Sequence, residues 1–106
     1  MSWFHELLGI GEKARVYILI KWQVFEGAYH FHAERCVRRA GLCGWMRVVK
    51  TPMYEYMEIE VEGSKVRIDR MINNLREGPP NSKATGLDVS WKTYGKKKYH
   101  EFRIRS

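Results

Sequence analysis

The sequence is poor in cysteine and proline and has no long apolar run. Its 106 residues include two cysteines and three prolines, and no apolar stretch approaches the roughly 20 residues that span a bilayer. Cys36 and Cys43 are too few for a disulfide framework and cannot by themselves form a zinc site. We therefore expect a cytoplasmic protein that does not bind a membrane and whose thiols are reduced and packed in the core.

Acidic residues are also in the minority. Twelve Asp and Glu stand against nineteen Lys and Arg, a net charge of +7. Such an excess attracts polyanions such as nucleic acid or phosphorylated small molecules, but it is also typical of a solubilising surface. An apolar share of 44% and an aromatic share of 13% exclude a mainly disordered chain. The length suits one domain, which we expect to be a monomer.

The first residues differ in pattern from the rest, and we treat residues 1–14 as an N-terminal extension of a domain at 15–106. The extension is not typical of a secretory signal, because its apolar run is short and Glu6 interrupts it. Apolar side chains at helical spacing predict a short turn that packs on the domain or, alternatively, makes a self-association patch: Trp3, Phe4, Leu7 and Leu8.

The remaining chain alternates between strand and helix patterns. Residues 54–62 alternate strictly between apolar and acidic side chains, as in a strand with one wet face. Residues 29–40 have apolar side chains at the 3.6 period of a helix, and Gly41 is placed to end it. We expect helices at 29–40 and 65–77, and strands at 15–24, 44–50, 54–62, 85–91 and 99–105.

This order predicts a ferredoxin-like β-α-β-β-α-β sandwich with an extra C-terminal strand. We expect an antiparallel sheet with both helices on one face, and a hairpin-like turn at residues 94–98 between the last two strands. Many unrelated functions use this fold, so function has to be argued from the residues.

Four short motifs occur in order along the chain: Gly41-Leu-Cys-Gly-Trp-Met-Arg47, Glu60-Val-Glu-Gly63, Gly78-Pro79 and Phe102-Arg-Ile-Arg105. In these motifs and their spacing the chain resembles the acylphosphatase family over residues 15–105. The resemblance implies hydrolysis of acyl phosphates to carboxylate and phosphate, without metal or cofactor. It implies a loop whose N–H groups cradle the phosphate, an arginine that forks onto it, and an asparagine that orients the attacking water.

The chain departs from the family pattern at these positions. Alignment without gaps from Gly44 places the phosphate loop at Phe25, Glu26, Gly27, Ala28, Tyr29 and His30. His30 then stands at the arginine position, Val48 at the asparagine position and Glu26 at a loop glycine. A shift of one residue would restore the glycine as Gly27 but would put Phe31 at the arginine position.

These substitutions weaken the expected chemistry. His30 can donate only one or two hydrogen bonds, Val48 has no group that orients water, and Glu26 repels an anion. Arg47 and Lys50 could supply supporting charge. We therefore predict a weak or inactive acylphosphatase that keeps the family scaffold and binds an acyl phosphate or inorganic phosphate.

The alternative is a non-catalytic basic module that binds phosphate-bearing partners such as nucleic acid. Cations interleaved with aromatic residues near the C-terminus form a candidate polyanion patch, which is equally consistent with a solvated surface: Lys92, Lys96, Lys97, Lys98 and Arg103. Helix 29–40 adds Arg35, Arg38 and Arg39. A standard RNA recognition motif is not expected, because strand 54–62 is acidic and lacks that motif's glycines.

A metal site is not expected. His30 and His32 lie two residues apart on a helix, so their side chains face different directions, and no cysteine or carboxylate stands at ligand spacing. We predict no metal and no cofactor.

Overall fold

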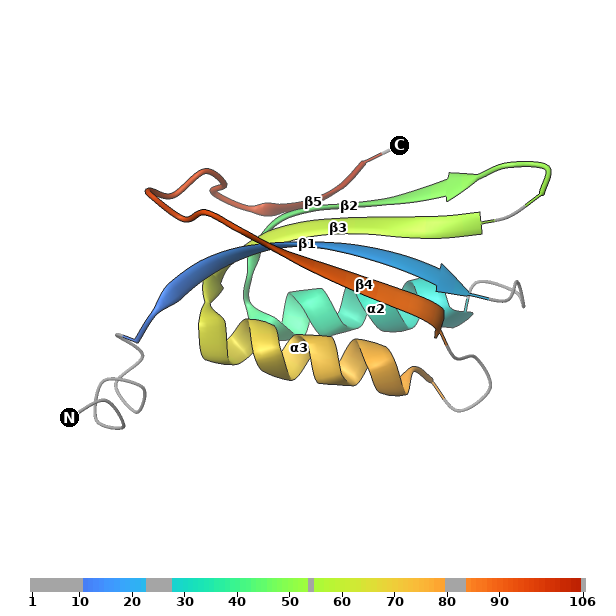
Figure 1. The fold of residues 1–106 in the computed structure, drawn as a ribbon, viewed down its shortest axis with the longest axis horizontal. Helices are drawn as coiled ribbons and strands as arrows, with labels where there is room; N and C mark the ends of the chain where they lie inside the picture. The colour runs from blue at the N-terminus through green and yellow to red at the C-terminus, as the bar shows by residue number, and fades with distance from the viewer. Residues whose placement is uncertain (1–10, 23–27, 54, 80–83, 106) are drawn as a thin grey trace.

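A computed structural model describes residues 11–22, 28–53, 55–79 and 84–105, and these form a sheet with two helices on one face (Figure 1). Most of the predicted extension and residues 23–27 of the predicted phosphate loop lie outside the described residues. Within them, no helix is long and apolar enough to cross a membrane. The elements are β1 (Lys13–Trp22), α2 (Ala28–Ala40), β2 (Cys43–Lys50), β3 (Glu55–Ser64), α3 (Lys65–Glu77), β4 (Ala84–Lys92) and β5 (Phe102–Arg105).

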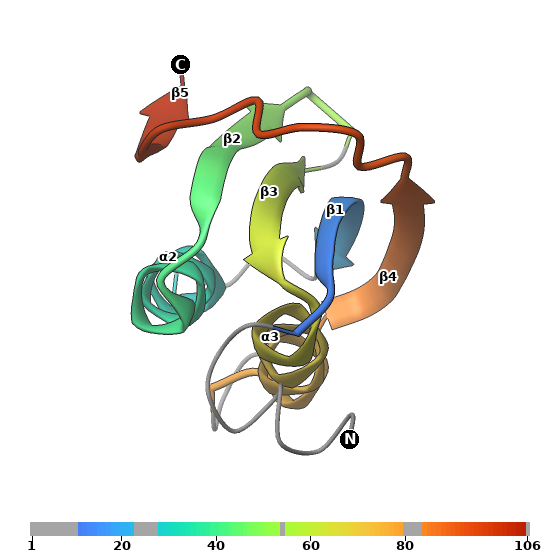
Figure 2. The ribbon, with the colours of Figure 1, turned by 90° about the vertical axis from the view of Figure 1, so that its left-hand side faces the viewer.

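The predicted element order and ferredoxin-like architecture are confirmed, but the predicted arrangement of the last two strands is wrong. The strand order is β4-β1-β3-β2-β5, so β4 and β5 lie at opposite edges of the sheet. The β5 strand pairs in parallel with β2, and the sheet is therefore mixed. Residues 93–101 are not a hairpin turn: they cross the face of the sheet that the helices leave open (Figure 2).

Alternation along the strands builds the core. In β1, Val16, Ile18 and Ile20 are fully buried, and they pair with alternating buried residues of β3. Because successive strand residues point to opposite faces, the apolar set faces the helices and the charged set faces the crossing segment. The helices and β2 complete the core with Tyr29, Ala33, Val37, Met46, Ile68, Met71 and Leu75.

Local residues mark the helix ends. Ser64 precedes α3, and its hydroxyl accepts a hydrogen bond from the Arg67 backbone N–H at 3.4 Å. Gly41 and Gly78 follow the two helices with φ of 67° and 68°. A positive φ favours glycine, and both helices stop at the predicted residues.

Candidate functional site

The start of α2 is the described part of the predicted phosphate loop. Ala28, Tyr29 and His30 form its first turn, and that turn carries no acidic residue. The first backbone N–H groups of a helix lack helical partners and favour a negative charge. The start of α2 therefore suits an anion, while Phe25, Glu26 and Gly27 lie outside the described residues.

Tyr29 fixes this end of the helix to the body of the domain. Its side chain is fully buried, and its hydroxyl donates a hydrogen bond to the Leu75 carbonyl of α3 at 2.6 Å. Burial raises the pKa of this hydroxyl well above its ordinary value, so it remains a neutral donor. The bond holds the first turn of α2 against the last turn of α3.

His30 contributes a polar atom that the described residues do not satisfy. Its Nε2 is buried and has no hydrogen-bond partner among them. The ring stacks on Phe31 with centroids 5.6 Å apart and an interplanar angle of 13°. A buried, unpaired nitrogen costs free energy, and a ligand oxygen at the start of α2 would satisfy it.

Val48 lies on the helix-facing side of β2. It pairs with Met57 of β3 and packs, partly buried, against the hydrophobic core. Lys50 follows two residues later on the same face, with its side chain 76% exposed and its Nζ 3.7 Å from a Glu55 carboxylate oxygen. Of the two predicted supporting cations, Lys50 therefore shares the face of Val48.

Arg47 does not share that face. Its Nε donates a 2.9 Å hydrogen bond to Glu58 Oε1 on the open side of the sheet, and Glu58 also accepts the Tyr17 hydroxyl at 2.5 Å. Strand alternation explains the difference, since Arg47 is one residue from Val48. Burial and the bond to Glu58 raise the pKa of Tyr17 to about 12. Arg47 thus forms an ion pair with Glu58 on the face of the sheet opposite Val48.

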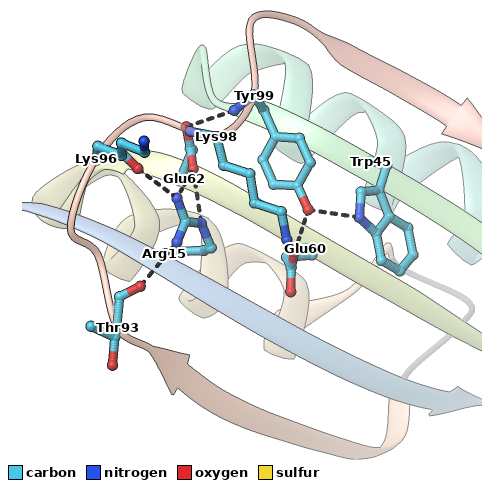
Figure 3. Close-up of polar contacts among 8 residues, drawn as sticks. All are labelled: Arg15, Trp45, Glu60, Glu62, Thr93, Lys96, Lys98 and Tyr99. Carbon is cyan, nitrogen blue, oxygen red and sulfur yellow. Dashed lines mark hydrogen bonds and ion pairs between the residues drawn. The ribbon is translucent and has the colours of Figure 1, made fainter.

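A buried carboxylate organises the open face of the sheet, where the alternation of residues 54–62 had predicted a wet face (Figure 3). Glu62 is 3% exposed, and it is the only buried charged residue among the described ones. Arg15 donates to its Oε1 from Nε at 2.9 Å and Nη2 at 2.7 Å. The backbone N–H groups of Lys98 and Tyr99 donate to its Oε2 at 2.8 and 3.0 Å. Finding Glu62 would have required the β1–β3 register, which sets it opposite Arg15.

The same network fastens residues 93–101 across the open face. Arg15 also donates to the carbonyls of Thr93 and Lys96, both at 2.9 Å. The Tyr99 hydroxyl donates to Glu60 and accepts a 3.1 Å hydrogen bond from the Trp45 indole (Figure 3). Backbone polar groups of the crossing segment are thereby satisfied by side chains of the sheet.

Most members of the predicted polyanion patch already have partners. Lys92 lies over the Tyr17 ring at 5.6 Å. Lys98 Nζ is 3.5 Å from Glu60, and Arg103 is paired with Glu101 at 2.5 Å. The side chains of Lys96 and Lys97 are exposed and have no hydrogen bond or ion pair to the described residues. The patch is spread over β4, the crossing segment and β5 rather than gathered at a hairpin tip.

The described residues include no cluster of three or more metal-ligand side chains. His32 Nε2 lies 2.9 Å from the Asn74 carbonyl and 3.5 Å from Cys36 Sγ. Cys36 and Cys43 are both free thiols of intermediate exposure. The His32–Asn74 contact joins α2 to α3, and the His32–Cys36 contact lies within α2.

Comparison with known proteins agrees with this architecture. A family model described as Acylphosphatase matches residues 16–104. The acylphosphatase of Anaeromyxobacter sp. (strain Fw109-5) is 30% identical over 86 residues, which cover 81% of this chain and 89% of that protein. The acylphosphatase of Methylococcus capsulatus is 33% identical over 75 residues, covering 71% of this chain and 78% of that protein.

Solved structures give the same fold. The crystal structure of acylphosphatase from Bacillus subtilis superposes with a TM-score of 0.71 at 19% identity, covering 88% of this chain and 99% of that one. The structure of an acylphosphatase from Coxiella burnetii superposes with a TM-score of 0.70 at 17% identity, covering 88% of this chain and 93% of that one. With the family model spanning almost the whole described domain, the chain belongs to the acylphosphatase family.

Proposed function

We propose that this acylphosphatase-family domain binds phosphate groups at the start of α2 but hydrolyses acyl phosphates weakly or not at all. The observation that carries the proposal is Val48. Its side chain lies against the apolar core at the position where the family resemblance implies an asparagine. An isopropyl group neither donates nor accepts a hydrogen bond, so it cannot orient a water molecule for attack.

The reaction depends on such positioning. An acyl phosphate is already activated, so a catalyst mainly has to place water in line and neutralise charge on the phosphoryl oxygens. Loss of the group that places the water removes one of these two contributions. Lys50 lies on the same face and supplies charge, but an ammonium group has no acceptor with which to hold a water proton.

Binding is expected to survive better than turnover. The buried Nε2 of His30, which has no partner among the described residues, and the positive end of the α2 dipole are suited to phosphate oxygens. His30 offers fewer donors than an arginine fork, so we expect modest affinity. At its predicted position in the loop, Glu26 adds a like charge beside the anion and opposes binding.

The test combines turnover and binding. We expect the wild-type protein to hydrolyse benzoyl phosphate slowly, and inorganic phosphate to perturb the amide resonances of residues 28–30 in a titration followed by NMR. His30→Ala should weaken that binding. His32→Ala is the matched control, because His32 points to Asn74 of α3 instead. Efficient turnover by the wild type, or equal effects of the two substitutions, would refute the proposal.

The exposed side chains of Lys96 and Lys97 favour a second candidate function, a basic module that binds nucleic acid. Exposed lysines contribute to phosphate-backbone binding in a salt-dependent way. The check is fluorescence anisotropy with a labelled single strand at several salt concentrations. Lys96→Gln/Lys97→Gln should weaken binding, whereas Lys13→Gln/Lys21→Gln, which removes two exposed charges from β1, should have little effect. Equal weakening would indicate attraction to net charge alone.

A further inference from the structure

The helices carry a basic excess of their own, in addition to that of the C-terminal segment. Helices α2 and α3 together carry seven Lys and Arg against three Asp and Glu. They therefore account for more than half of the net charge of +7. On the open face of the sheet, by contrast, Glu58, Glu60 and Glu62 pair with the cations around them.

The arginines of the two helices meet at a groove. A pocket of about 350 Å³ lies between the second half of α2 and the first half of α3. Arg39 forms one wall, Arg67 and Arg70 form the other, and Asn74 adds an amide group. Neither a carboxylate nor an aromatic ring is among its lining residues.

The three guanidinium groups are available to a ligand. All three residues are exposed, and none of their side chains makes a hydrogen bond or ion pair with the described residues. The neighbouring acids are already engaged, since Glu34 binds Arg38 and Asp69 binds Lys65. The groove is thus an uncompensated positive site.

The groove is also partly preorganised. A Cβ placed on Gly41 would lie 3.3 Å from Arg67 Nη1, so this guanidinium rests against the chain at the end of α2. The negative end of the α2 dipole favours a cation there. Cys36 also lines the groove. Burial raises the pKa of its thiol, and the positive charges of Arg39 and Arg35 act against that rise.

We propose that the groove formed by Arg39, Arg67, Arg70 and Asn74 is a second anion site, which binds small molecules carrying two or three linked phosphate groups. Planar guanidinium forks match phosphate oxygens, and three of them around one groove match several neighbouring charges. The lack of an aromatic lining leaves a nucleic-acid base without a surface to stack on. The ligand is therefore recognised through its phosphates, at a place separate from the start of α2, where Tyr29 packs against the opposite end of α3.

The test is isothermal titration calorimetry with inorganic tripolyphosphate at low ionic strength. Removing two charge-assisted contacts with Arg67→Gln/Arg70→Gln should weaken binding at least about tenfold. Lys13→Gln/Lys21→Gln removes the same charge from β1 and should bind almost as the wild type does. All four positions are exposed, and circular dichroism verifies that each variant is folded.

A second variant separates the fork geometry from charge. Arg67→Lys/Arg70→Lys keeps the net charge, and it should still bind more weakly than the wild type. A single-stranded oligothymidine titrated in parallel should show no greater dependence on Arg67 and Arg70 than on Lys96 and Lys97. Unchanged tripolyphosphate binding in the Gln variant, equal weakening in both Gln variants, or arginine dependence confined to the oligonucleotide would overturn the proposal.

Discussion

Arg15 and Glu62 face each other across the β1–β3 pairing, with Arg15 Nη2 2.7 Å from Glu62 Oε1. Through its second oxygen, Glu62 accepts two backbone N–H groups of residues 98 and 99. One carboxylate therefore joins two central strands to the segment that crosses over them. This connection lets the chain leave β4 at one edge of the sheet and pair as β5 at the other.

Glu62→Gln should lower the free energy of unfolding by about 3 kcal/mol, because breaking a buried ion pair leaves Arg15 without its counter-charge. Urea denaturation followed by tryptophan fluorescence measures the change. Glu101→Gln is the matched control: it breaks the Arg103 pair, in which both side chains are more than half exposed. That pair should contribute less than about 1 kcal/mol. Equal losses in the two variants would contradict the role assigned to Glu62.

Acid should destabilise the protein through the same carboxylate. Burial acts to raise the pKa of Glu62, but the Tyr99 and Lys98 N–H groups and Arg15 hold it below the ordinary value of 4.5. The unfolded chain then binds more protons near that pH, so this stabilisation is complete above 4.5 and is lost as the pH falls through the lowered pKa. The pKa of Glu58 is lowered too: burial acts to raise it, but the hydrogen bonds from Tyr17 and Arg47 outweigh that effect.

The measurement for this pH dependence is urea denaturation of the wild type and Glu62→Gln at about pH 7 and about pH 3. The loss of stability on acidification should be smaller in the variant, which has one fewer carboxyl group to protonate. A variant that loses as much stability as the wild type would show that Glu62 does not carry the effect.

Gly44 of the glycine–tryptophan motif should tolerate no side chain. Its φ is 149°, and a Cβ there would lie 2.0 Å from the Glu60 carbonyl oxygen on β3. Gly44→Ala should therefore force β2 and β3 apart and cost about 3 kcal/mol or more. Gly86→Ala on β4 is the control, because a Cβ there meets nothing within 4 Å. Thermal unfolding compares the two, and similar midpoints would contradict the packing argument.

The local elements could be predicted because their signals are local. Strict alternation in β3, the 3.6 period in α2 and the glycines after both helices depend only on neighbours in the sequence. The position of β5 depends on contacts far along the chain. Tyr94 and Gly95 are typical of a tight turn, but Glu62 and Arg15 bind the segment that contains them, and Phe102 packs on the core beside β2.

The candidate site was predictable to a similar extent. The strand pattern of residues 44–50 predicted one strand for Val48 and Lys50, and alternation along that strand puts both on one face. Arg47 was grouped with them by closeness in sequence, and the structure places it on the other face with Glu58. The arginine groove could not be predicted, because Arg39 lies far from Arg67 and Arg70 in the sequence and meets them only through helix packing.

The most direct test of the central claim is the rate of benzoyl phosphate hydrolysis by the double variant His30→Arg/Val48→Asn beside the wild type. Restoring the fork that binds phosphate and the amide that orients water should raise the rate by at least about 100-fold, because a single positioned group of this kind contributes about that much. His32→Arg/Val49→Asn is the control, with the same residue types off the proposed site. A wild type that already turns over as fast as the double variant would contradict the claim that these two positions limit catalysis.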